Sequence, residues 1–257
     1  MSIGIGLLFL FLSIPPADAA PLPDSAIQMA DNQPQPGISG PVEGTPEPQA
    51  SFSLSWDVTL ASKYLFQGID YSDGKPVVQP EVVLAVKDFS VILWLNHDLH
   101  TQNTNEMDLY LQYDWEIQDL SATAGYAHYD YPNRIGWDPS QEVFLDLSYS
   151  APLNPSISIH YDFDAGKGTY TTVGISREQE TFLGTSSVGI NLFYQSHYYG
   201  TTGFPAMEFK GSTGYPIGSL TITPSFSYFM TWDNGDFQGD STLPDPWLFS
   251  INMSQSF

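Results

Sequence analysis

Acidic side chains stand at alternate positions in the most regular stretch of this sequence, and they are its clearest candidates for a chemical role. From residue 106 to 117 the chain alternates acidic or polar residues with apolar ones, beginning Glu106, Met107, Asp108, Leu109. Successive side chains of a β-strand point to opposite faces, so this spacing puts the carboxylates on one face. A surface that carries one sign of charge concentrates counter-ions, and this face therefore favours cations.

The same alternation recurs along the chain, and the ionisable residues that it places on polar faces form one candidate set. Most of them are acidic, and the predicted set is Asp57, Lys63, Glu106, Asp108, Asp114, Glu116, Asp146, His160, Asp162, Asp164, Glu208 and Lys210. If the opposite faces meet lipid, these residues line the interior of a barrel.

A second pattern, Ser158, His160 and Asp162, has the residue types of a serine hydrolase. Alternate residues lie ~6.6–7 Å apart along a strand, whereas a nucleophile and its base need a hydrogen bond of ~2.6–3.2 Å. We therefore interpret these residues as a polar row, and the sequence predicts no catalytic residue and no enzyme. A lipid hydrolase embedded in a barrel is the alternative.

The predicted loops carry Asp130, Asp138, Asp233, Asp236, Asp240 and Asp245. Carboxylates can bind Ca²⁺ or Mg²⁺, but the spacing in WDNGDFQGD does not match an EF-hand loop. The sequence has no cysteine, so it offers no thiolate ligand. We expect solvated loop acids, no metal site and no cofactor. With 29 Asp+Glu against 7 Lys+Arg, a net charge of −22 also argues against a nucleic-acid partner.

Twelve stretches with a period of two predict the elements that position these residues. The first runs from Phe52 and is expected to continue through Ser62 and Tyr64 to Phe66, before a turn at 72–76. Short connections, such as 87–88 and 118–119, alternate with longer polar ones, although the connection near 178–185 is expected to be longer. The seven basic residues lie in turns, loops, strand ends or polar faces. This pattern predicts an all-β fold: a transmembrane antiparallel up-and-down β-barrel of about 12 strands over residues 51–257.

The two ends of the chain indicate where the barrel resides. Residues 1–19 are predicted to be a signal peptide, with an apolar run at 3–14 and small residues before a cleavage site at Ala19. Residues 20–50 carry seven prolines and are predicted to be a disordered, proline-rich periplasmic leader. At the other end, a closing strand is expected to pair with Phe52–Leu60. Its apolar face forms a predicted signal for the outer-membrane assembly machinery: Trp247, Phe249, Ile251, Met253 and Phe257.

The stretch ASKYLFQGIDYSDGKPVVQPEV, residues 61–82, resembles the N-terminal hairpin of the TorF-type porin family of proteobacterial outer-membrane proteins. The positions that fit the family pattern are Ser62, Tyr64, Gly68, Ser72, Pro76 and Gln79. Gln67 stands where the family often has Arg, and Asp70 where it often has Ser. A second stretch, NEMDLYLQY, fits through Glu106, Asp108, Tyr110 and Tyr113. The resemblance extends over about 52–130 and implies an outer-membrane barrel without a known substrate.

Together these features predict a porin-like channel in the bacterial outer membrane, through which small solutes, cations among them, diffuse passively. Barrels of about eight strands are filled by side chains, whereas roughly 16–18 strands leave an aqueous channel. Twelve strands fall between these sizes. A structural or adhesion barrel with a filled lumen is therefore the second interpretation. The expected partners are outer-membrane lipid, the barrel assembly machinery and small solutes.

Overall fold

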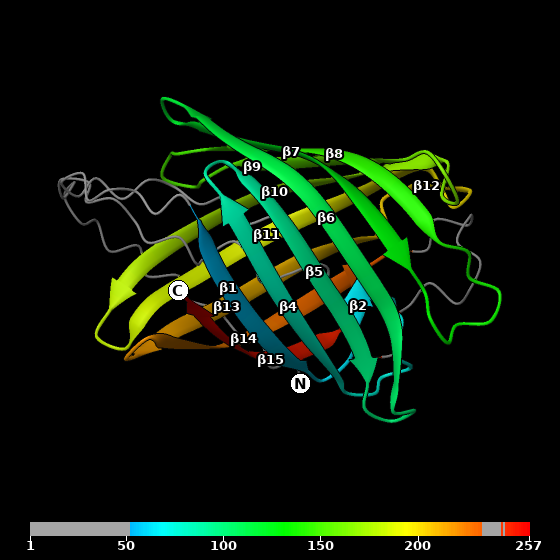
Figure 1. Ribbon diagram of the computed structural model, residues 1–257, viewed down its shortest axis with the longest axis horizontal. Helices are drawn as coiled ribbons and strands as arrows, with labels where there is room; N and C mark the ends of the chain where they lie inside the picture. Colours follow the sequence, from blue (N-terminus) through cyan, green and yellow to red (C-terminus); the bar gives the residue numbers. More distant parts are fainter. Residues whose placement is uncertain (1–51, 233–242, 244) are drawn as a thin grey trace, which may run out of the picture.

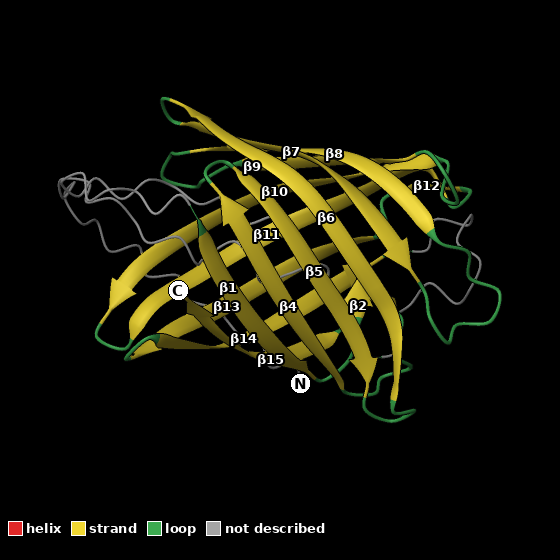
Figure 2. Cartoon of the chain, viewed as in Figure 1, coloured by secondary structure: helices red, strands yellow, loops and turns green. Residues whose placement is uncertain are grey.

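The computed structural model describes residues 52–232, 243 and 245–257, and the fold in these residues is built from β-strands (Figures 1 and 2). Within them there is no helix that is long and apolar enough to cross a membrane. The sequence predictions for 1–19 and 20–50 lie outside the described residues.

Twelve antiparallel strands form a closed barrel, as the alternation predicts. Consecutive wall strands pair with each other around the barrel, and β10 pairs with β11. The barrel closes where the last strand, β15, pairs with the first, β1. The strands are β1 (Ser53–Ala61), β4 (Val77–Val86), β5 (Phe89–Asp98), β6 (Asn103–Ile117), β7 (Leu120–Asp130), β8 (Ser140–Tyr149), β9 (Ser156–Asp162), β10 (Gly168–Thr181), β11 (Gly184–Tyr198), β13 (Ala206–Ile217), β14 (Leu220–Thr231) and β15 (Trp247–Ser256). The short strands are β2 (Leu65–Phe66), β3 (Ile69–Asp70) and β12 (Thr201–Gly203).

The outer face of the barrel is apolar and the inner face is mostly polar. On β6, Leu109 and Leu111 are exposed, whereas their neighbours Asp108 and Tyr110 are buried. A continuous exposed belt of large apolar side chains is not a feature of water-soluble proteins, but it is the surface that a barrel presents to lipid. The alternating positions of β6 therefore separate a lipid face from an interior face.

Connections of different length lie at the two ends of the barrel. At one end most turns have two residues, although the β8–β9 connection spans 150–155. Lys87 and Gln118 adopt positive φ angles of 56° and 57° in two of the two-residue turns. The β10–β11 connection is also a two-residue turn, at 182–183, so the longer connection expected near 178–185 is wrong: both strands continue past the predicted boundary. At the other end lie the loops 99–102, 131–139, 163–167 and 199–205. We call the first of these the turn end of the barrel and the second the loop end.

The closing strand pairs as predicted, with Asp57 opposite Ser254 and Leu60 opposite Ile251. Leu248 breaks the polar alternation of this tail because it lies on the inner face, where it is buried beneath a segment that enters the barrel.

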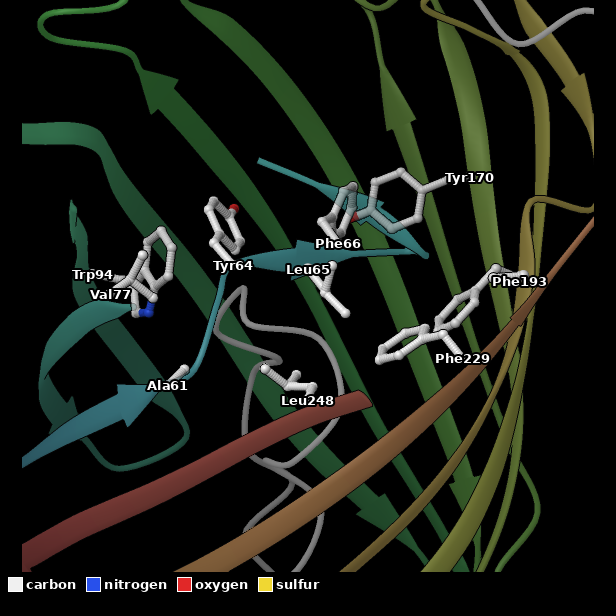
Figure 3. Close-up of a cluster of buried hydrophobic side chains, with 11 residues drawn as sticks. Ala61, Tyr64, Leu65, Phe66, Val77, Trp94, Tyr170, Phe193, Phe229 and Leu248 are labelled. Atoms are coloured by element: carbon white, nitrogen blue, oxygen red, sulfur yellow. The ribbon is translucent and has the colours of Figure 1, made fainter. Parts of the chain in front are cut away.

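That segment, residues 62–76, corrects the prediction that the first wall strand continues to Phe66. β1 ends at Ala61, and the chain then enters the barrel and forms the hairpin of β2 and β3 (Figure 3). Its turn is Gln67–Gly68, with φ angles of 51° and 84°, the combination that a tight two-residue hairpin turn requires. We call residues 62–76 the lumen hairpin. Alternation alone could not reveal it, because Tyr64 and Phe66 are apolar like a lipid-facing row but pack against the inner wall.

Candidate functional site

The inner face of the barrel collects most of the ionisable residues predicted to lie there. The buried ones are Lys63, Glu106, Asp108, Asp146, His160, Asp162 and Glu208. Asp57, Asp114 and Lys210 are half-buried on inner positions of the wall. Lys63 differs from its prediction, since it belongs to the lumen hairpin and not to a wall strand.

Two predicted residues are exposed. Glu116 lies near the turn end of β6, beside the Gln118–Asp119 turn. Asp164 lies in the loop after β9, where its carboxylate accepts a hydrogen bond from Gln141 Nε2 at 3.0 Å. Gln141 occupies an outward position of β8, so Asp164 leans away from the interior.

The inner face also contains acids that the candidate set omits. Glu81 is 4% exposed and stands opposite Asp57 on the neighbouring strand. Its signal is present in the sequence, because it alternates with Val82 and Leu84. Glu142 is fully buried, and it was missed because the predicted strand began one residue later, at Val143.

Glu142 organises the most densely bonded part of the interior. Its Oε2 accepts from Tyr129 Oη at 2.9 Å and faces His160 Nδ1 at 3.1 Å, while its Oε1 accepts from Tyr198 Oη at 3.1 Å. The His160 ring lies between the rings of Phe144 and Tyr170, at centroid distances of 5.0 and 4.3 Å. A carboxylate that is buried from water needs such donors, so this cluster fixes β7, β8, β9 and β11 to one another.

The sequence argument that Ser158 and His160 lie too far apart for a hydrogen bond is wrong. His160 Nε2 lies 3.0 Å from Ser158 Oγ, because the two side chains lean toward each other along β9 and close the gap between alternate residues. Ser158 Oγ donates to Asp146 Oδ1, so Nε2 is left to donate to the hydroxyl, and Nδ1 faces a carboxylate. With both ring nitrogens in donor roles, His160 is arranged to hold Ser158 in a network and not to accept its proton.

The half-buried acids have fewer hydrogen-bond partners than Glu142. Asp57 Oδ1 accepts from Asn252 Nδ2 at 2.9 Å, and Asp114 Oδ1 accepts from Thr123 Oγ1 at 2.5 Å. Asp57 also contacts the Glu81 carboxyl group on the neighbouring strand. Asp57 and Asp114 both keep partial contact with solvent, so they are the acids best placed to meet a passing ion.

The lumen hairpin fills the interior at the loop end. Tyr64, Leu65 and Phe66 are at most 4% exposed. They pack against inner-face residues of several wall strands (Figure 3): Val77, Trp94, Tyr170, Phe193, Ala206, Phe229 and Leu248.

Two basic side chains join the lumen hairpin to other loops. Lys63 Nζ lies 2.9 Å from Asp245 Oδ2, and this hydrogen bond, with a second from the Trp247 backbone N–H, lowers the pKa of Asp245. Arg134 Nη2 donates to the Tyr71 carbonyl at 2.7 Å, and its guanidinium lies 4.5 Å from the Trp137 ring centroid. The loop end is therefore bridged from two sides. Among the described residues, no group of three or more His, Asp or Glu side chains is placed to hold a metal ion.

Comparisons with known proteins agree with this architecture. Residues 45–151 match the model of a family described as a bacterial protein of unknown function (Gcw_chp), which is less than half of the chain. No curated protein matches. The NanC porin is similar in structure, with a TM-score of 0.53 and 13% sequence identity over 78% of this chain and 98% of that one. The KdgM porin in complex with disordered oligogalacturonate has a TM-score of 0.48 and 11% identity, over 80% of this chain and 99% of that one.

The chain thus has the closed β-barrel fold of the outer-membrane porins. Identities this low show the fold alone. The family-model match covers the whole of the 52–130 stretch that resembles the TorF-type porins.

Proposed function

We propose that this protein is a passive outer-membrane channel for small solutes and that its acidic interior favours cations. The observation that carries the proposal is the interior of the closed barrel, where carboxylates such as Asp57, Glu81 and Asp114 far outnumber the two basic side chains, Lys63 of the lumen hairpin and Lys210 of the wall. A lumen lined by one sign of charge raises the local concentration of the opposite ion. Selectivity would come from lumen width and charge, without a catalytic step.

The finer assignments belong to the same proposal. The resemblance over 52–130 is the observation on which we place this chain with the TorF-type porins. The apolar outer face of β15, which ends in Phe257, supports recognition by the barrel assembly machinery. The signal peptide, the 20–50 leader and the lipid partner are proposed on the sequence features given above.

Conductance in planar lipid bilayers tests the channel. The purified full barrel should produce discrete current steps, and in a salt gradient its reversal potential should show cation preference. Asp57→Asn combined with Asp114→Asn should reduce that preference, because both carboxylates are half-buried inner residues. Asp164→Asn is the matched control, since Asp164 is an acid that leans away from the interior. If the double variant and the control give equal reversal potentials, the acidic lining does not set selectivity.

The lumen hairpin gives the second interpretation specific support. An interior filled by Tyr64, Leu65 and Phe66 suits a structural or adhesion barrel. Absence of any current steps from a correctly folded barrel would favour that function over the channel.

The hydrogen-bonded pair Ser158 and His160 makes a hydrolase test worthwhile as well. We expect no cleavage of phospholipid or lipid A by the reconstituted barrel. Cleavage that disappears in Ser158→Ala would establish the hydrolase instead.

A further inference from the structure

The lumen hairpin crosses the barrel from one wall to another. It leaves the wall at Ala61 on β1 and returns at Val77 on β4. At its tip, Gln67 Oε1 accepts a hydrogen bond from Gln195 Nε2 of β11 at 2.8 Å. A Cβ atom added to Gly68 would lie 2.6 Å from Ala206 Cβ of β13. The tip is therefore in direct contact with strands that are not neighbours of its base in the barrel.

Along its length the hairpin packs apolar side chains against the surrounding wall. The ring of Tyr64 lies 5.8 Å from that of Trp94, and the ring of Phe66 lies 5.5 Å from that of Tyr170. Leu65 is fully buried. Figure 3 shows these side chains between the hairpin and the strands around it. Water and ions do not readily enter a layer of packed apolar side chains, and narrow hydrophobic layers close other channels.

Hydrogen bonds within the hairpin hold it together as a unit. Tyr64 N donates to Ser72 Oγ at 2.8 Å, and Tyr71 N donates to the Tyr64 carbonyl at 2.8 Å. The Asp70 carboxylate accepts from Ser72 N at 2.9 Å and from Gly74 N at 2.7 Å. These bonds close within residues 64–74, so the hairpin can change its position without losing its own structure.

The contacts between the hairpin and the wall are of a different kind. The tip is joined to β11 by a neutral amide pair, and the middle of the hairpin contacts the wall by apolar packing. The other polar contacts lie toward the base, where Ser62 bonds Phe249 of β15 and where Lys63 and Tyr71 bond the neighbouring loops. Asp73 and Gly74, near its base, have positive φ angles of 52° and 70° and lie in an exposed turn. Short exposed segments of this kind can absorb a hinge rotation.

We propose that the lumen hairpin is the gate of the channel: packed against β11 and β13 it closes the loop end, and its movement away from them opens it. This inference rests on the proposed channel function. Opening exposes Leu65 and Phe66 to water, so the closed state is favoured in the absence of a solute. Several residues that fit the TorF-type pattern, among them Tyr64, Gly68 and Ser72, lie in the gate.

Tethering the tip to the wall tests the gate directly. The chain has no cysteine, so Gln67→Cys with Gln195→Cys introduces the only two thiols. Cd²⁺, which bridges neighbouring thiolates, should reduce the bilayer current of this variant several-fold, and a chelator should restore it. Each single-cysteine variant is a matched control and should keep its current in Cd²⁺. A double variant that conducts equally with and without the bridge would overturn the gate.

Removing the hairpin tests the closed layer in the opposite direction. Replacing residues 65–70 by Gly-Gly should raise the conductance several-fold and increase the fraction of time spent open. Leu65→Ser with Phe66→Ser, which keeps the chain length, should also increase the open fraction. Unchanged currents in both variants would show that the hairpin does not close the channel. If the wild type and the shortened variant, both folded, fail to conduct, the channel function itself is refuted, whereas a wild type that conducts regardless of every change refutes the gate alone.

Discussion

The inner wall of this barrel has two unlike halves. From β5 to β10 several inward side chains are large rings, and Tyr110, Phe144, His160 and Tyr170 contact one another through them. From β14 through β15 to β1 most inward side chains are small and polar: Thr223, Ser225, Ser227, Ser250, Asn252, Ser254 and Thr59. The larger inward side chains on these strands are Phe229, Leu248 and Asp57. The β5–β10 half therefore forms a packed core, whereas the side chains of the β14–β15–β1 half occupy little of the barrel's cross-section.

This difference assigns different tasks to the two halves. Large rings packed around the buried Glu142 carboxylate stabilise the wall, because both oxygens of this carboxylate have hydrogen-bond partners. Short hydroxyl side chains leave the adjoining space to the lumen hairpin at the loop end and to solute toward the turn end. Solutes should therefore pass along β14, β15 and β1. The hairpin touches both halves, through Trp94 and Tyr170 on one and through Leu248 on the other.

The largest effect is expected in the packed half. Glu142→Leu removes the acceptor of Tyr129, Tyr198 and His160 and leaves these groups buried without it. Loss of one partner from a buried charged network costs about 3–5 kcal/mol. Urea unfolding in lipid vesicles should show this decrease in the free energy of unfolding.

Two control variants test whether this loss of stability arises from the Glu142 carboxylate. Glu142→Gln keeps one acceptor oxygen and should lose clearly less stability. Val143→Leu changes the adjacent lipid-facing residue, which is 46% exposed, and should be close to neutral. Equal losses in Glu142→Leu and Val143→Leu would contradict a stabilising core in this half.

The next effect concerns the fit of the hairpin tip. Gly68→Ala places a Cβ atom 2.6 Å from Ala206 Cβ on a backbone with φ of 84°. Gly200 has a similar φ of 79°, but nothing lies within 4 Å of an added Cβ. Gly200→Ala should cost about 1–2 kcal/mol from the left-handed backbone alone, and Gly68→Ala should cost about 1–3 kcal/mol more from overpacking. The same unfolding measurement compares them; indistinguishable variants would mean that the tip is not tightly seated.

A third effect concerns the path of the solute along β14, β15 and β1, the half of the wall with small inward residues. Ser254→Trp adds a large ring to an inner, half-buried position of β15 and should lower the single-channel conductance several-fold. Met253→Trp adds the same ring at the neighbouring position on the lipid face, where the side chain is 38% exposed, and should leave conductance unchanged. Equal conductance in the two variants would place the solute path elsewhere.

The sequence predicts the wall well and the interior only partly. Alternation gives the twelve strands, the lipid face and the closure of β15 on β1, because one apolar and one polar face leave few other arrangements. The lumen hairpin escapes the same reasoning, since Tyr64 and Phe66 alternate like wall residues. Within this stretch Gln67–Gly68 marks the turn at which the hairpin reverses, but no residue marks the point after Ala61 at which the chain leaves the wall. Contacts between distant segments, such as Glu142 with Tyr198, depend on barrel closure and have no local signal.

The smallest effect is expected at the anchor between Lys63 and Asp245. Lys63 Nζ bonds both the carboxylate and the backbone carbonyl of Asp245, at 2.9 and 2.7 Å, so the backbone bond survives in Asp245→Asn. The carboxylate side chain is 65% exposed, and ion pairs in contact with water contribute little and are screened by salt.

The pH dependence of this anchor has a definite sign. The hydrogen bond from Lys63 lowers the pKa of Asp245 below its ordinary value of 3.8. The stabilisation is therefore present above pH 3.8 and is lost as the pH falls through the lowered pKa. Urea unfolding of the wild type at low salt should show this acid-dependent loss, and Asp245→Asn should lack that component. High salt should reduce the difference between them. Wild-type and variant curves that stay parallel through this pH range would show that the small-residue half holds the hairpin by packing, without help from the ion pair.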